Sequence, residues 1–285
     1  MADLDSPDFA WPAPAKINRF LHICGREPNG YHRLQTVFQF IDWCDELFFQ
    51  CRDDGKIVRE YQLSGVAEED DIVIKAARLL IQTVGDVPGV SINLKKTLPM
   101  GGGLGGGSSN AATVLVALNY LWKCNLDVDR LAALGLSLGA DVPVFVRGQS
   151  AWAEGVGERL SKIDLDEPWY LVVVPDCSVS TKEIFTAPEL FRDHPEIDEQ
   201  AFRRGEAGND CEPVVRARYP QVAAVLDWLS DYGAPRMSGT GASVFAAFEQ
   251  REHAEDVAAQ CPPGSLCRVV KGMNASPLRA LFYAS

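Results

Sequence analysis

Leu98-Pro99-Met100-Gly101-Gly102-Gly103-Leu104-Gly105-Gly106-Gly107-Ser108-Ser109-Asn110-Ala111-Ala112 is the most informative stretch of this 285-residue chain. The strand-like run Val90 to Leu94 precedes it, and Ser108 and Ser109 are suited to cap a helix that follows. That helix is predicted from apolar residues at helical spacing: Ala111, Val114, Leu115, Leu118, Leu121 and Trp122. Backbone N–H groups at a helix start bind anions, and glycine lets phosphate oxygens approach the main chain. The stretch therefore predicts a phosphate-binding loop.

Other interpretations of the glycine-rich segment, Gly101 to Gly107, are weaker. A mobile loop before a capped helix remains possible from the local pattern alone. A Walker A loop would need Lys before Ser, but Gly107 occupies that place. A dinucleotide fold would need an acidic residue at the end of a second strand about 20 residues further on. Asp127 follows the helix with no room for that strand, so we expect a mononucleotide site.

The composition limits the partners that the chain can have. Hydrophobic residues make up 47% of the sequence and charged residues 23%, as in globular proteins. The formal net charge of -12 disfavours a nucleic-acid surface. No apolar run approaches the roughly 18 residues that cross a bilayer, and the start of the chain is acidic where a signal peptide is basic. We expect a cytoplasmic protein without nucleic-acid or membrane partners, and the sequence indicates no oligomeric state.

Two further helices are predicted, Ile72 to Val84 after the capping residues Asp70 and Asp71, and Arg130 to Leu138, which Gly139 stops. Three more strands are predicted at Tyr170–Val174, Val244–Phe248 and Cys267–Val270. The acidic, proline-containing stretch Ser161 to Pro168 is typical of an exposed crossing between domains. We therefore expect an N-terminal nucleotide-binding domain over 1–164 and a second α+β domain over 165–285.

The eight cysteines form no C-x-x-C pair, so neither a zinc quartet nor a disulfide framework is expected. Most are predicted to be small buried thiols.

Three motifs, in order along the chain, resemble the GHMP kinase superfamily: Pro14-Ala15-Lys16-Ile17-Asn18, the glycine stretch, and Ser238-Gly239-Thr240-Gly241-Ala242. Within it, Gly25 to His32 and Gly139 to Phe145 are similar to the kinases that act on a cytidine-diphosphate-linked methylerythritol in the non-mevalonate isoprenoid pathway. The resemblance implies an α+β fold with a ribosomal-S5-like N-terminal domain, a ferredoxin-like C-terminal domain and a site in the cleft between them. It also implies ATP as its magnesium complex and a small cytidine diphosphate substrate.

The same resemblance implies Lys16 and Asp141 as the catalytic pair. Asp141 would accept the proton of the attacking 2-hydroxyl group. Lys16 would favour the ionised carboxylate and offset charge on the phosphoryl group. Without the resemblance, Asp141 would be interpreted as a turn residue that bonds its own backbone, and Lys16 as a surface charge. Asn18, two residues after Lys16, would face the same side of a strand and could bond the substrate diol.

The remaining site residues are also implied by the resemblance. Nucleotide contacts are expected from Lys96, Pro99, Met100, Gly101, Gly102, Gly103, Leu104, Gly105, Gly106, Gly107, Ser108, Ser109 and Asn110. Substrate contacts are expected from Asn18, Tyr31, His32, Phe38, Thr181, Phe185 and Gly239. Core packing is the alternative for both phenylalanines, a loop hydroxyl for Thr181, and a hairpin turn for the late glycine motif. Asp71 stands where related enzymes often carry an Asn for adenine, and a carboxylate cannot donate as an amide does. The metal ligands stay open.

Three alternative functions fit the sequence less well. Another GHMP-type kinase with a different alcohol acceptor would share the ATP loop, but Tyr31, His32 and Phe185 argue against it. A non-catalytic nucleotide-binding regulator would not need both Lys16 and Asp141. A nicotinamide-dependent oxidoreductase would need the strand and acidic residue that are absent after the glycine helix.

Overall fold

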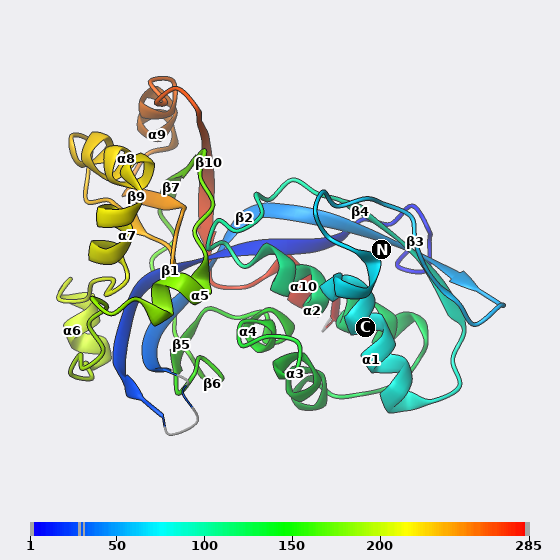
Figure 1. Cartoon of the computed structure of the whole chain (residues 1–285). Helices are drawn as coiled ribbons and strands as arrows, with labels where there is room; N and C mark the ends of the chain where they lie inside the picture. Colours follow the sequence, from blue (N-terminus) through cyan, green and yellow to red (C-terminus); the bar gives the residue numbers. More distant parts are fainter. Residues whose placement is uncertain (1–2, 28–29, 31, 283–285) are drawn as a thin grey trace.

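The computed structural model describes residues 3–27, 30 and 32–282. Two halves lie side by side, and the long strands β1 (Trp11–Arg26) and β2 (His32–Arg52) run through both (Figure 1). The N-terminal half adds β3 (Ile57–Arg59), α1 (Ile72–Val84), β4 (Gly89–Lys95), α2 (Gly106–Leu121), α3 (Val128–Leu136), α4 (Val142–Arg147), β5 (Ala151–Glu154) and β6 (Arg159–Lys162). The C-terminal half adds β7 (Trp169–Pro175), α5 (Thr181–Thr186), α6 (Glu199–Arg203), α7 (Glu212–Arg218), α8 (Pro220–Ser230), β8 (Arg236–Met237), β9 (Val244–Phe248), α9 (Arg251–Ala258), β10 (Ser265–Met273) and α10 (Pro277–Phe282). The α+β prediction is confirmed.

β2 is the central strand of the molecule. It pairs antiparallel with β1, β4, β5 and, at Ile41 and Phe40, with the end of β10. Because β10 also pairs with β7, and β7 with β9, the strands of the two halves form one continuous sheet. β1 and β2 lie in register with Lys16 opposite Phe40 and Asn18 opposite Phe38. Both polar side chains are thus fixed at the middle of the sheet.

The helices cover this sheet with separate apolar cores. α1, α2 and α4 pack on the N-terminal strands, while α7, α8 and α9 pack on the C-terminal strands (Figure 1). A smaller cluster lies between the two cores and includes Ile41 of β2, Leu98, Leu104 and Tyr170 of β7, all buried. Since Leu98 and Leu104 flank the glycine-rich segment, this cluster attaches that segment to the junction of the halves.

The predicted helix boundaries hold to different degrees. α1 has the predicted bounds, and the side chain of Asp71 caps it by accepting from Val73 N, whereas Asp70 lies in a short 3₁₀ turn. α3 begins earlier than predicted, because Asp127 accepts from Arg130 N and caps a helix that starts at Val128. The predicted stop at Gly139 is wrong, because α3 ends at Leu136 and Ser137 occupies its C-cap.

The predicted caps of the glycine helix are also wrong. α2 starts at Gly106, its N-cap is Gly105 with φ 72°, and no side chain caps it. Ser108 and Ser109 lie inside its first turns, because the last residue with positive φ in the loop is Gly105. The four predicted strands are all present, and Val244–Phe248 has the predicted bounds.

The stretch from Ser161 to Pro168 leads from β6 to β7 and is largely exposed, as its charges predicted, but two of its residues are buried. Ile163 and Leu165 are only 3% and 7% exposed and pack with Phe20 and Val37 in a small core cluster. Apolar and acidic residues alternate here, since Asp164 and Asp166 are exposed while Ile163 and Leu165 are buried. The division into domains at residue 164 stays a prediction.

The cysteine prediction needs two corrections. Cys261 and Cys267 form a disulfide, which closes the short loop between α9 and β10 around Pro262, Pro263 and Gly264. Of the free cysteines only Cys24 and Cys211 are buried, and Cys51 is exposed. Spacing could not predict the pair, because a turn and not a metal-type motif brings the two sulfurs together. Among the helices of residues 3–282 that the structure describes, none is long and apolar enough to cross a membrane.

Candidate active site

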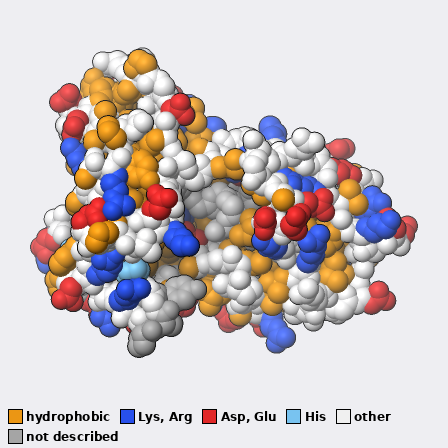
Figure 2. Space-filling model, in the orientation of Figure 1, with side chains coloured by type: hydrophobic (Ala, Val, Ile, Leu, Met, Phe, Trp, Pro, Cys, Tyr) orange, Lys and Arg blue, Asp and Glu red, His pale blue; other side chains and the backbone are white. Residues whose placement is uncertain are grey.

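A cavity of about 660 Å³ lies between the two halves. The space-filling view is hollowed in this region (Figure 2). All the predicted nucleotide contacts line this cavity except Ser109, which is buried. The predicted catalytic and substrate residues that line it are Lys16, Asn18, Phe38, Asp141, Thr181, Phe185 and Gly239. Folding therefore brings together residues that are more than 200 positions apart in the sequence.

The glycine-rich segment needs its glycines for steric reasons. Gly101, Gly103 and Gly105 have φ values of 71°, 75° and 72°, which residues with a Cβ rarely adopt. A Cβ on Gly103 would overlap the carbonyl oxygen of Ser238, and one on Gly105 would lie 2.7 Å from the Phe145 ring. The loop ends at the start of α2, whose first N–H groups lack partners within the helix. An anion in the cavity could accept hydrogen bonds from them.

Asp45 on β2 anchors the segment that enters this loop. Its carboxylate is 0% exposed and accepts from Thr97 N at 2.7 Å, Leu98 N at 2.8 Å and Lys96 Nζ at 2.5 Å. The predicted nucleotide contact Lys96 thus has an ion-pair partner that sequence reasoning missed. A Cβ on Gly106 would lie 3.1 Å from Lys96 Nζ, so this ammonium group lies next to the N-terminus of α2. Two positive features meet at one side of the cavity.

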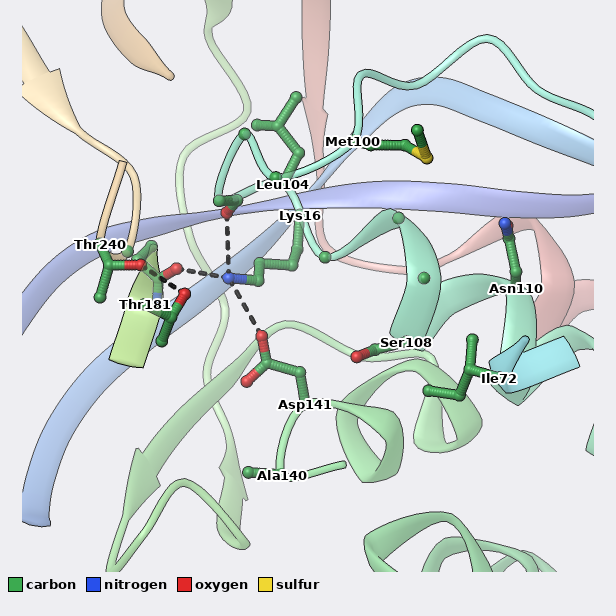
Figure 3. A pocket seen from close by; sticks show the side chains of 18 of the residues that line it. Lys16, Ile72, Met100, Leu104, Ser108, Asn110, Ala140, Asp141, Thr181 and Thr240 are labelled. Carbon is green, nitrogen blue, oxygen red and sulfur yellow. Dashed lines mark hydrogen bonds and ion pairs between the residues drawn. The ribbon is translucent and has the colours of Figure 1, made fainter. Parts of the chain in front are cut away.

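The predicted catalytic pair is in contact. Lys16 Nζ lies 3.2 Å from Asp141 Oδ2, and it donates to Asn18 Oδ1 at 2.5 Å and to Gly103 O at 3.2 Å (Figure 3). The side chain of Lys16 is 4% exposed and that of Asp141 33% exposed. A buried ammonium group surrounded by three oxygen acceptors is fixed in place, while the carboxylate beside it stays open to the cavity.

Asp141 occupies the N-cap position of α4, yet its side chain makes no capping hydrogen bond. The alternative of a turn residue that bonds its own backbone is therefore not what the structure has. Instead, the carboxylate points toward the ammonium group of Lys16, and both residues line the cavity (Figure 3).

Asn18 and Ser238 connect β1 to both glycine motifs. Asn18 Nδ2 donates to Thr36 Oγ1 at 2.9 Å, and Asn18 N donates to Ser238 Oγ at 3.1 Å. Ser238 Oγ in turn donates to Gly103 O at 2.9 Å. The late glycine motif, the glycine-rich segment and the strand that carries Lys16 are thus joined by direct hydrogen bonds. The glycines mark this motif in the sequence, whereas the role of Ser238 depends on partners that lie far away along the chain.

The opposite wall carries aromatic and hydroxyl groups. Thr181 Oγ1 and Thr240 Oγ1 lie 2.9 Å apart (Figure 3), and the Phe185 ring stacks on His32 with 5.2 Å between centroids. Arg192 Nε donates to His32 Nε2 at 3.1 Å. Burial, with the nearby charges of Arg192 and Arg26, lowers the pKa of His32, which favours the neutral acceptor form. His32 supports Phe185 from behind and does not itself line the cavity.

The predicted contact Tyr31 lies outside the described residues. The other cavity-lining residues, which were not among the predicted contacts, are Leu21, Leu34, Thr36, Leu63, Val66, Asp70, Asp71, Ile72, Val73, Ala140, Val156, Gly157 and Thr240. Most are apolar residues of ordinary type, but Ala140 and Thr240 carried a signal, since they stand inside the Gly139–Phe145 stretch and the late glycine motif.

Asp71 stands where an amide is expected from related enzymes, and its carboxylate is used in contacts within the fold. It is buried, caps α1 through Val73 N, accepts from Tyr61 OH at 2.7 Å and lies 3.1 Å from Arg59 Nε. Burial and this hydrogen bond to Asp71 raise the pKa of Tyr61 well above its usual range.

One His/Asp group among the described residues has metal-ligand spacing, namely His22, His194 and Asp210. The two imidazole rings are stacked, with centroids 3.5 Å apart and 12° between planes. A metal lies in the ring plane of a histidine ligand, so two parallel rings cannot both point a lone pair at one ion. His22 Nε2 also accepts from Gly208 N at 3.0 Å. This group is therefore a structural contact.

The fold and the site together define a class of phosphotransferases. The sequence pattern of the GHMP kinases N terminal domain matches residues 71–149, and that of GHMP kinases C terminal matches residues 187–262. The crystal structure of the Methanococcus jannaschii mevalonate kinase superposes with a TM-score of 0.69 over 93% of this chain and 98% of that one, at 13% identity, which shows the shared fold. The predicted GHMP kinase architecture is confirmed.

The particular family follows from relatives of higher identity. The 4-diphosphocytidyl-2-C-methyl-D-erythritol kinase of Nitrosococcus oceani is 54% identical over 268 residues, or 94% of this chain and 96% of the relative. That of Shewanella loihica is 52% identical over 270 residues, or 94% and 95%. A crystal structure of 4-(cytidine 5'-diphospho)-2C-methyl-D-erythritol kinase has a TM-score of 0.80 and 32% identity, over 93% of this chain and 99% of that one. The chain belongs to the family of 4-diphosphocytidyl-2-C-methyl-D-erythritol kinases, and it is a kinase that uses ATP.

Proposed function

We propose that the chain transfers the γ-phosphoryl group of ATP to the 2-hydroxyl group of 4-diphosphocytidyl-2-C-methyl-D-erythritol. The observation that carries the proposal is the buried Lys16 ammonium group, held between Asp141, Asn18 and the carbonyl of Gly103 at the edge of the phosphate-binding loop. The membership of the family supports the choice of acceptor.

In the proposed reaction the acceptor hydroxyl group attacks the γ-phosphorus while its proton passes to Asp141. The bond from the γ-phosphorus to the bridging oxygen breaks, and ADP leaves with that electron pair. Lys16 would offset the negative charge that develops on the transferred group. The N–H groups at the start of α2, with Lys96, would hold the phosphates. Catalysis would thus rest on position and charge.

Magnesium is proposed as the partner of ATP. The donors near the loop fit this ion, because Asp141 is partly exposed to the cavity and Ser108 adds a hydroxyl oxygen. Mg²⁺ takes oxygen ligands and needs only one or two from the protein, since ATP supplies others. When bound, it would neutralise charge on the β- and γ-phosphates. Because ATP and cytidine nucleotides are supplied there, we also propose a cytoplasmic location.

The substrate pocket is proposed around Phe185, supported by His32, with Phe38 on the side of β2. A flat cytosine ring can stack on an aromatic side chain. Asn18 and Thr181 offer polar groups to the acceptor.

The test is an acceptor panel with purified protein, ATP and magnesium, with ADP formation as the measurement. 4-Diphosphocytidyl-2-C-methyl-D-erythritol, mevalonate, homoserine and galactose are compared in parallel. Turnover confined to the cytidyl substrate is expected. Turnover with another acceptor alone would keep the kinase chemistry and overturn the pocket assignment, and no turnover with any acceptor would overturn the function.

A further inference from the structure

The segment Gly208-Asn209-Asp210 lies against the edge of β1 beyond the catalytic strand positions. Leu21 N donates to Gly208 O and Asp210 N donates to Leu21 O, both at 2.9 Å. Asp210 Oδ2 also accepts from Ile23 N at 2.7 Å. Together with the bond from Gly208 N to His22 Nε2, these contacts fix the backbone on both sides of Asn209.

The side chain of Asn209 uses all of its polar atoms. Its Nδ2 donates to Met237 O and Gly239 O, both at 2.8 Å, and its Oδ1 accepts from Cys211 N at 2.9 Å. Only an amide can donate twice and accept once in this place. Asn209 therefore connects the segment fixed on β1 to the turn that carries the late glycine motif, without lining the cavity itself.

The turn held by Asn209 forms part of the cavity wall. A Cβ on Gly239 would lie 3.2 Å from Asn18 Oδ1, and Thr240 Oγ1 lies 2.9 Å from Thr181 Oγ1. The preceding residue, Ser238, has other anchors, because its hydroxyl group is bonded to Asn18 N and Gly103 O. Ser238 is thus anchored to the nucleotide loop by its own hydroxyl group, while the following residues, Gly239 and Thr240, extend toward Asn18 and Thr181.

We propose that Asn209 is a positioning residue for the phosphoryl acceptor. It holds Gly239 and Thr240 against Asn18 and Thr181. The acceptor side of the cavity is therefore preorganised before the acceptor hydroxyl group binds. This inference rests on the proposed function, since it concerns the acceptor side of the same cavity. Small displacements at such a wall change rates strongly, because reaction needs the attacking atom within a narrow range of positions.

The test uses Asn209→Asp, which keeps the shape and the acceptor atom but removes both donors at neutral pH. The value of kcat/KM for the cytidyl acceptor should fall about 10- to 100-fold. Affinity for a non-hydrolysable ATP analogue, measured by calorimetry without acceptor, should change less than about threefold. Asn93→Asp, the same substitution at an exposed position on β4, is the matched control and should retain both values.

Equal losses for acceptor and nucleotide, or kcat/KM values like those of the control, would overturn the proposal. If Asn209→Asp unfolds, Asn209→Ala and Thr240→Val are compared singly and together at a temperature where all are folded. The double variant should lose less than the product of the two single losses, and independent losses would contradict a role through the turn. Failure of the proposed function would appear already in the wild-type protein, as absent turnover with the cytidyl acceptor.

Discussion

At the scale of single residues, the site depends on a lysine that has almost no contact with solvent. Its ammonium group meets the oxygens of Asp141, Asn18 and Gly103, so its charge is balanced by one carboxylate and two dipoles. Removing one partner of a buried ion pair leaves the other charge poorly compensated. The carboxylate is the more exposed partner, and it is the group that can exchange a proton with a bound alcohol.

Asp141→Asn should retain nucleotide binding and lose phosphoryl transfer. The amide keeps an oxygen near Lys16 but cannot take the hydroxyl proton, so kcat should fall by about 100-fold or more. Steady-state kinetics with the cytidyl acceptor give this number, and calorimetry gives the affinity for the ATP analogue. The control is Asp129→Asn on α3, where the carboxylate forms an exposed ion pair with Arg147 of α4. A variant that kept more than about a tenth of wild-type kcat would show that Asp141 is not the base.

At the scale of elements, the glycine-rich segment and α2 form one unit that is attached along its whole length. Asp45 holds its entrance, Ser238 holds its middle at Gly103, and Phe145 packs against Gly105 at its end. The glycines within it are therefore not equivalent. Gly105 has φ 72° and no space for a Cβ, whereas Gly107 lies in the helix and a Cβ there would meet only the Ile72 side chain at 3.8 Å.

Gly105→Ala should destabilise the protein, while Gly107→Ala should not. A left-handed conformation costs an alanine about 1–2 kcal/mol, and overlap with Phe145 adds to this. A loss of about 2 kcal/mol corresponds to a Tm decrease of roughly 3 °C for a chain of this size. Differential scanning calorimetry of the two variants checks the prediction, and equal Tm values would contradict the steric account.

The sequence predicted the glycine-rich segment and the catalytic pair, but not the residues that hold them in place. The glycines, Lys16 and Asp141 stand in motifs whose chemistry can be recognised from the sequence alone. Asp45 and Asn209 are ordinary residue types whose partners lie far away or in a loop, so no spacing pattern marked them. The same limit explains Ile163 and Leu165, whose burial was hidden by the acidic residues between them. The caps of α2 were misplaced because backbone conformation, and not a side chain, starts that helix.

At the scale of the whole molecule, the junction of the halves contains a buried histidine. His22 of β1 is 0% exposed, and its Nε2 accepts from Gly208 N. Burial, followed by the nearby His194, lowers the pKa of His22 from its usual 6.5 to about 4, although Asp210 acts in the other direction. The folded protein therefore keeps this imidazole neutral where the unfolded chain would protonate it.

The stability of the fold should consequently fall on acidification between pH 6.5 and about 4. In this window the unfolded chain binds more protons at His22, so the free energy of unfolding rises with pH and is lost as pH falls. The loss from this residue is about 3 kcal/mol in total. Urea unfolding at several pH values should show a shallower pH dependence for His22→Gln than for the wild-type protein. His253→Gln, at an exposed position on α9, should keep the wild-type slope, and equal slopes for both variants would exclude His22 as the source.

The shared strands also bear on whether the halves could be exchanged as modules between proteins. Leu21 and Ile23 of β1 and Leu34 of β2 are part of the apolar core or packed against it in the C-terminal half, while β10 returns to pair with β2. A graft of residues 165–285 alone would leave out these side chains, and a fragment ending at residue 164 would expose them. We expect that an exchange between members of the family yields a folded protein only when the β1–β2 pair and both halves come from the same chain. The two halves therefore do not act as separate modules.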